Sequence, residues 1–131
     1  MASSKPMGSR KKAPFANIPH HIMESENYKK LGAWEVKLLL ELSYKFRGKN
    51  NGDLSATWSD SKKFGWRSKG TLSKAIERLV KYGFIQLTRQ GGMHQCSLYA
   101  LTWHPIDECQ GKHEVSPTKT PSNLWKNESG E

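Results

Sequence analysis

The 131-residue sequence has only two cysteines, Cys96 and Cys109, and no apolar run near the roughly 20 residues that cross a bilayer. Two cysteines cannot form a disulfide framework, and these two lack the paired C-x-x-C spacing of a zinc knuckle. The N-terminus is positively charged, but no hydrophobic stretch follows it, so no export signal is predicted. We therefore expect a soluble, cytoplasmic protein without a membrane partner.

The sequence also lacks the motifs that accompany common catalytic chemistry. It contains no phosphate-binding glycine loop, no nucleophile elbow, no H-E-x-x-H and no acidic pair suited to acid–base catalysis. Its scattered Cys and His residues match no tetrahedral zinc spacing. They are His94, Cys96, His104, Cys109 and His113. We predict that the protein is not an enzyme and needs no cofactor or metal.

Acidic residues are scarce in the middle of the chain. Residues 45–94 hold eleven Lys and Arg against three Asp and Glu, so this block carries most of the net charge of +9. Such a concentrated positive field attracts polyanions, of which nucleic acid is the commonest in a cytosol. The alternative is a basic surface that only increases solubility.

Both ends of the chain have little apolar periodicity. Residues 1–14 and 105–131 are rich in Ser, Thr, Pro, Gly, Asn and Lys. Neither segment is expected to bury enough surface to offset the entropy lost on ordering. We predict a disordered basic arm at 1–14, one domain at 15–104 and a disordered C-terminal tail at 105–131.

The first predicted helix spans residues 33–46, where apolar residues recur with helical spacing and form a core face. A second, narrower apolar stripe on the same helix consists of Val36, Leu40 and Tyr44. The core face does not account for this stripe. Either the apolar segment 15–23 or a dimer partner would have to cover it.

Two further helices follow, each with its own capping residue. Thr57 is the predicted N-cap of a short helix at 58–63, and Ser68 is the predicted N-cap of a helix at 69–82. The second helix has apolar residues at i, i+3, i+4, i+7 and i+8, and it ends at Gly83.

The predicted strands lie mainly near the end of the domain. Residues 84–89 and 97–103 are rich in β-forming residues and flank the glycine-containing segment 90–95, which predicts a hairpin. A very short strand is expected at 54–56. The order of helix, short strand, short helix, longer helix and hairpin predicts an α+β winged helix-turn-helix: a three-helix core with a β-hairpin wing and flexible tails.

The helix at 69–82 is the predicted DNA-recognition helix. Its outward ridge is mostly basic, whereas a helix that merely faces solvent usually mixes charges of both signs. The predicted DNA-binding residues at its start and along this ridge are Arg67, Ser68, Lys69, Thr71, Lys74, Arg78 and Lys81. Further contacts with the DNA backbone are predicted from Lys62, Lys63, Arg89 and His94.

Aromatic residues lie among these basic ones. Trp58, Phe64 and Trp66 are candidates for stacking on the bases of a single strand. Their spacing favours packing beneath the helix-turn-helix instead. Trp34 lies on the flank of the core face of the first predicted helix.

These residues form a recognisable pattern between positions 15 and 103. Its elements are Phe15-x-x-Ile18-Pro19, Ser25-x-x-Tyr28-x-x-Leu31, Asn51-Gly52-x-Leu54, Phe64-Gly65, Thr71-Leu72-x-x-Ala75, Leu79-x-x-x-Gly83-Phe84-Ile85 and Tyr99-x-Leu101-Thr102. The pattern resembles small winged-helix proteins of bacteriophages, prophages and plasmids, and the N-terminal domains of phage replication initiators.

The resemblance implies sequence-selective binding of double-stranded DNA, for transcriptional control or replication of a mobile element in a bacterial host. The protein would then lie on the nucleoid when bound. A homodimer, or a replication or regulatory protein as partner, is also compatible with it. The alternative is a winged helix that docks on a replication or defence protein, and a third possibility is a non-specific binder of single strands or RNA.

Overall fold

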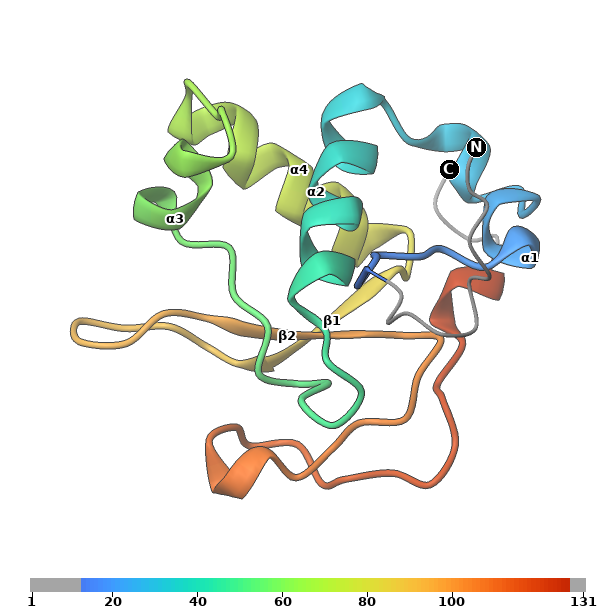
Figure 1. The fold of residues 1–131 in the computed structure, drawn as a ribbon, viewed down its shortest axis with the longest axis vertical. Helices are drawn as coiled ribbons and strands as arrows, with labels where there is room; N and C mark the ends of the chain where they lie inside the picture. The colour runs from blue at the N-terminus through green and yellow to red at the C-terminus, as the bar shows by residue number, and fades with distance from the viewer. Residues whose placement is uncertain (1–12, 128–131) are drawn as a thin grey trace, which may run out of the picture.

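A computed structural model describes residues 13–127, which form a small α+β fold (Figure 1). The described chain contains four α-helices and a two-stranded antiparallel sheet. Their bounds are α1 His20–Met23, α2 Ala33–Lys45, α3 Trp58–Lys63, α4 Lys69–Lys81, β1 Ile85–Arg89 and β2 Leu98–Leu101. Short 3-10 turns lie at Tyr28–Lys30, Cys109–Gly111 and Leu124–Lys126. Within residues 13–127, no helix has the length and apolar character to cross a membrane.

The predicted helix caps are confirmed. The Thr57 Oγ1 accepts a hydrogen bond from the Asp60 amide at 3.1 Å, and the Ser68 Oγ accepts one from the Thr71 amide at 3.2 Å. Each cap satisfies an amide that has no partner within its own helix. The helices α2 and α4 each end one residue before the predicted boundary.

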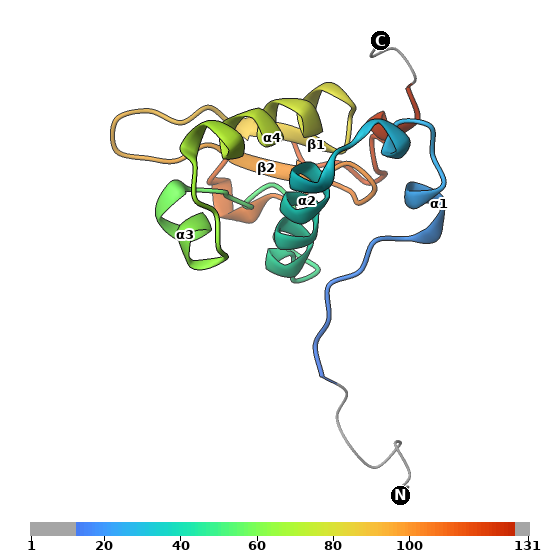
Figure 2. The ribbon, with the colours of Figure 1, turned by 90° about the horizontal axis from the view of Figure 1, so that it is seen from above.

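The core lies between α2, α4 and the hairpin. The helix α2 packs on α4, and α4 packs on β1. The fully buried apolar side chains at the centre are Leu38, Leu39, Leu42, Ala75, Leu79, Phe84, Ile85 and Leu101. Figure 2 shows α4 along one edge of the domain and the tip of the β1–β2 hairpin extending beyond the helices.

The hairpin has an irregular register. The residue Ile85 pairs with Leu101, and the register shifts between Leu87 and Arg89. The strand predicted at 54–56 is reduced to one bridge, in which the Tyr99 amide donates to the Leu54 carbonyl at 2.7 Å. The order of elements from α2 to β2 is compatible with the predicted winged helix-turn-helix.

The prediction of a disordered tail at 105–131 is wrong for residues 105–127. Trp125 is only 6% exposed and belongs to the main core. The buried Asn27 amide donates to the carbonyls of Tyr82 at 3.2 Å and Trp125 at 3.0 Å. The amide of Asn123 donates to the Thr102 carbonyl at 2.8 Å. The segment is ordered because a large apolar side chain is buried and its backbone finds partners in the domain.

A buried asparagine ties the start of this segment to the loop that follows α2. The Asn51 amide group donates to the carbonyls of Leu101 and Pro105, both at 2.9 Å. Its Oδ1 accepts from the Leu101 amide at 2.7 Å. The α2–α3 loop is thereby fixed to the end of β2. The predicted arm at 1–14 lies outside the described residues except for Ala13 and Pro14, which are exposed.

Candidate nucleic-acid interface

The helix α4 turns its apolar side inward and leaves a basic side exposed. Leu72, Ala75 and Leu79 are buried, whereas Lys74 and Lys81 on the opposite side are exposed. We group them with the exposed basic residues of α3 and the α3–α4 turn, and we call this set the basic face. It consists of Lys62, Lys63, Arg67, Lys69, Lys74 and Lys81.

No side chain of the basic face joins an ion pair within residues 13–127. The ion pairs of this part of the chain are Lys29–Glu26, Lys37–Glu41, Lys45–Asp60, Arg78–Glu35 and Lys112–Asp53. An exposed acid, Glu77, lies on the outer side of α4 near these lysines. The basic face therefore keeps charges that direct pairing within the described domain does not neutralise.

The start of α4 combines charge with available backbone amides. Ser68 and Lys69 are exposed, and Thr71 is half-buried. The Ser68 hydroxyl satisfies the Thr71 amide, so Ser68 has the ordinary capping role. The first turn of a long helix has a partial positive charge, which adds to that of Arg67 and Lys69.

Arg78 differs from its predicted position on the outward ridge. Its Nε lies 3.2 Å from the Glu35 Oε2, and its Nη2 donates to the Lys30 carbonyl at 2.8 Å. The guanidinium also lies over the Tyr82 ring, at 5.3 Å from the centroid. The physical reason is that the first turn of α2 lies along this side of α4 and presents a buried carboxylate. Arg78 is therefore part of the packing between α2 and α4.

Arg89 also serves the fold. Its Nη2 donates to the Cys96 carbonyl at 2.7 Å and its Nη1 donates to the Lys112 carbonyl at 3.3 Å. These bonds join the two sides of the hairpin beyond the register shift, and they join the hairpin to the C-terminal segment. His94, by contrast, is exposed at the hairpin tip. At the hairpin, His94 is therefore exposed, whereas Arg89 is engaged in the fold.

The packing interpretation is confirmed for Trp66. This residue is 3% exposed, and its Nε1 donates to the Glu41 Oε1 at 2.8 Å. Trp58 and Phe64 are half-buried and pack against the core. The large indole of Trp66 therefore offers little surface on which a base could stack.

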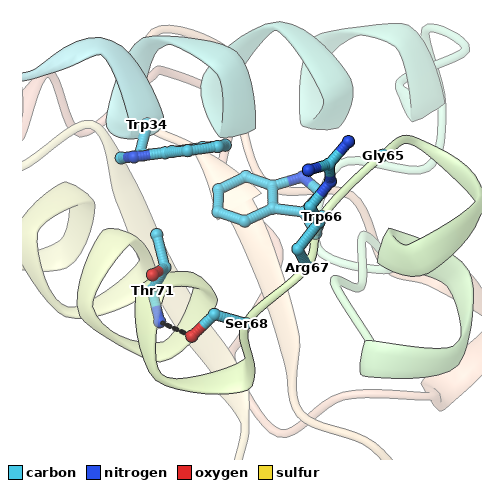
Figure 3. A pocket seen from close by; sticks show the side chains of 6 residues that line it. All are labelled: Trp34, Gly65, Trp66, Arg67, Ser68 and Thr71. Carbon is cyan, nitrogen blue, oxygen red and sulfur yellow. Dashed lines mark hydrogen bonds between the residues drawn. The ribbon is translucent and has the colours of Figure 1, made fainter.

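Trp34, predicted on the flank of the core face, lies in the first turn of α2 and is 48% exposed. It lines an open pocket of about 390 Å³ at the α3–α4 turn (Figure 3). The other lining residues are Gly65, Trp66, Arg67, Ser68 and Thr71. Helical periodicity places Trp34 at the edge of the core face. It cannot show how much of this side chain the neighbouring elements leave exposed.

Titratable groups elsewhere have structural roles. Lys45 beside Asp60 holds the pKa of that carboxyl below its ordinary value. Burial lowers the pKa of His104, whose ring stacks on Phe46 at 4.4 Å between centroids. Burial raises the pKa of the Cys109 thiol. Among residues 13–127, no three His, Cys, Asp or Glu side chains come together as a metal site.

Comparisons of the chain with protein-family models, with curated proteins and with solved structures found no match. The resemblance to winged-helix proteins of mobile elements stays a prediction.

Proposed function

We propose that the protein binds duplex DNA as a winged helix, with α4 as the recognition helix. The observation that carries the proposal is the basic face, whose six exposed Lys and Arg side chains join no ion pair within residues 13–127. Phosphates of a duplex would supply the missing counter-charges, and the release of condensed cations would favour binding.

We assign the two parts of the basic face to different parts of a double helix. The exposed edge of α4 can enter a major groove, which is about 12 Å wide. Lys74, near the middle of the exposed side of α4, is the residue that we assign to a base edge. Lys62 and Lys63 on α3, with Arg67 and Lys69 at the turn, are assigned to phosphates, because these exposed charges precede the exposed side of α4 along the chain.

The proposed role is sequence-selective binding that controls transcription or replication of a mobile element in a bacterial host. It requires no catalysis. The hairpin, with His94 at its exposed tip, would lie along the DNA backbone beside α4.

Selection from random duplex DNA tests this function. We expect enrichment of a short motif, and we expect Lys74→Ala to lower the preference for that motif by about 1–3 kcal/mol relative to random duplex. Lys63→Ala is the matched variant, which should weaken binding to every sequence alike. Failure to enrich any motif, together with equal effects of the two variants, would rule out readout by α4.

A second candidate function has its own supporting observation. Two residues of the stripe predicted on α2 stay exposed, Leu40 at 45% and Tyr44 at 61%, whereas Val36 is half-buried. Phe15, in the segment expected to cover the stripe, is itself exposed. The charged side chains of α2 are all ion-paired, so its outer side carries no uncompensated charge. Docking on a replication or regulatory protein through this stripe would give a complex that persists at high salt. Leu40→Asp should abolish such a complex without changing DNA affinity.

A further inference from the structure

The pocket beside Trp34 combines an exposed aromatic ring with a positively charged rim. The ring centroids of Trp34 and Trp66 lie 5.1 Å apart. Figure 3 shows the two rings between α2 and the start of α4. Arg67 lies on the Trp66 side of the pocket, and Thr71 lies on the Trp34 side. The volume of about 390 Å³ is in the lower part of the range of small-ligand sites.

Trp66, which lines this pocket, is held in place by its neighbours. Trp66 is anchored by its hydrogen bond to Glu41, whose other carboxylate oxygen lies 2.8 Å from the Lys37 Nζ. The Lys37 ammonium also lies 5.9 Å from the centroid of the Trp66 ring. Because Trp66 cannot move without breaking these contacts, Trp34 rests against a rigid neighbour and leaves about half of its own surface open.

The charges around the pocket favour a ligand that carries a negative charge. The two carboxylates nearby, Glu35 and Glu41, are buried and paired with Arg78 and Lys37. Arg67 is exposed at the rim and has no ion-pair partner within residues 13–127. A flat aromatic group attached to an anion fits this arrangement, with the flat group on Trp34 and the anion on Arg67.

We infer that the Trp34 pocket binds one unstacked nucleobase next to the duplex that the basic face holds. Base pairs inside a duplex cover both faces of each base by stacking, so only an unpaired nucleotide can present a face to Trp34. The preferred ligand is then a junction, in which a duplex continues into an unpaired nucleotide. The inference rests on the proposed function, because α4 must hold the duplex for the unpaired base to reach the pocket.

Binding of matched DNAs tests the inference. The probes are a blunt duplex and the same duplex with a short single-stranded overhang that begins with 2-aminopurine. The wild-type protein should bind the overhang form about 5- to 150-fold more tightly, and stacking on Trp34 should quench the 2-aminopurine fluorescence. Trp34→Leu should reduce the affinity for the overhang form to that for the blunt duplex. Tyr44→Leu, which alters an exposed aromatic residue on the same helix, should leave the preference intact.

The outcomes separate the two proposals. Equal wild-type affinity for both DNAs, or a preference that survives in a folded Trp34→Leu variant, overturns the inference and leaves duplex binding standing. Absence of binding to either DNA overturns the proposed function as well. If Trp34→Leu does not fold, the wild-type fluorescence decides: an unquenched 2-aminopurine in the bound complex overturns the inference.

Discussion

Arg78 and Glu35 join α4 to the first turn of α2, with the Arg78 Nε 3.2 Å from the Glu35 Oε2. This ion pair distinguishes Arg78 from Lys74, a cationic residue of α4 that joins no ion pair within residues 13–127. Arg78 belongs to the packing between the helices, and Lys74 belongs to the exposed basic face.

Substitution of Arg78 should therefore affect mainly stability, and substitution of Lys74 should affect mainly DNA binding. We expect Arg78→Ala to lower the free energy of unfolding by about 1–3 kcal/mol, because it leaves the buried Glu35 carboxylate without its cation. Lys74→Ala should leave stability within about 0.5 kcal/mol of the wild type and should weaken DNA binding. Urea unfolding and DNA titration of both variants check this contrast. A DNA defect in a fully folded Arg78→Ala that equals that of Lys74→Ala would contradict it.

The C-terminal segment should be required for stability. Trp125→Ala removes a buried side chain from the core, and we expect a loss of about 3–5 kcal/mol in the free energy of unfolding. The neighbouring Leu124 is more exposed, so Leu124→Ala should cost about 1 kcal/mol or less. Thermal and urea unfolding compare the two. A chain truncated after residue 104 that keeps wild-type stability would show that the segment does not support the core.

Two glycines with positive φ offer a matched test of the same packing. Gly83 has a φ of 84°, and a Cβ there would collide with the backbone of Leu124 and lie 2.9 Å from the Trp125 nitrogen. Gly65 has a φ of 97°, and a Cβ there would meet no atom within 4 Å. Gly65→Ala should cost about 1 kcal/mol, from the backbone conformation alone. Gly83→Ala should cost about 2–5 kcal/mol, because the C-terminal segment must also move. Equal losses in melting experiments would mean that residues 124–125 do not press on the α4–β1 turn.

Stability should depend on pH through His104. Burial lowers the pKa of this imidazole in the folded state, so the unfolded chain binds a proton more readily than the folded one. The neutral His104 side chain contributes its full share to the free energy of unfolding above its ordinary pKa of about 6.5. This share is lost as the pH falls below that value and through the folded pKa. His104→Gln should flatten the fall in the free energy of unfolding below pH 6.5. An unchanged pH profile in the variant would assign the acid sensitivity to other groups.

The local signals in the sequence predict α2, α3 and α4 to within one residue, but they do not predict the short helix α1 at His20–Met23. Thr57 and Ser68 were identified as caps because a hydroxyl followed by an apolar helical repeat satisfies an amide close by in the chain. Arg78 was misplaced because its partner Glu35 lies far away in the sequence, and helical periodicity describes only one element at a time. Trp125 was missed because it stands almost alone in a polar segment, and only tertiary packing shows what it contacts.

The central claim, that the basic face binds the phosphates of duplex DNA, is tested most directly by the salt dependence of binding in two charge-matched variants. Lys63→Gln/Lys69→Gln removes two charges of the basic face that we assign to phosphates, and Lys49→Gln/Lys119→Gln removes two exposed charges elsewhere. In anisotropy titrations with duplex DNA, log K should fall with log salt for the wild type, and the slope should drop by up to about 0.9 for each phosphate contact removed in the first variant. The second variant should keep the wild-type slope and affinity to within a small, uniform change. No binding at about 50 mM salt, or equal slopes for both variants, would contradict the claim.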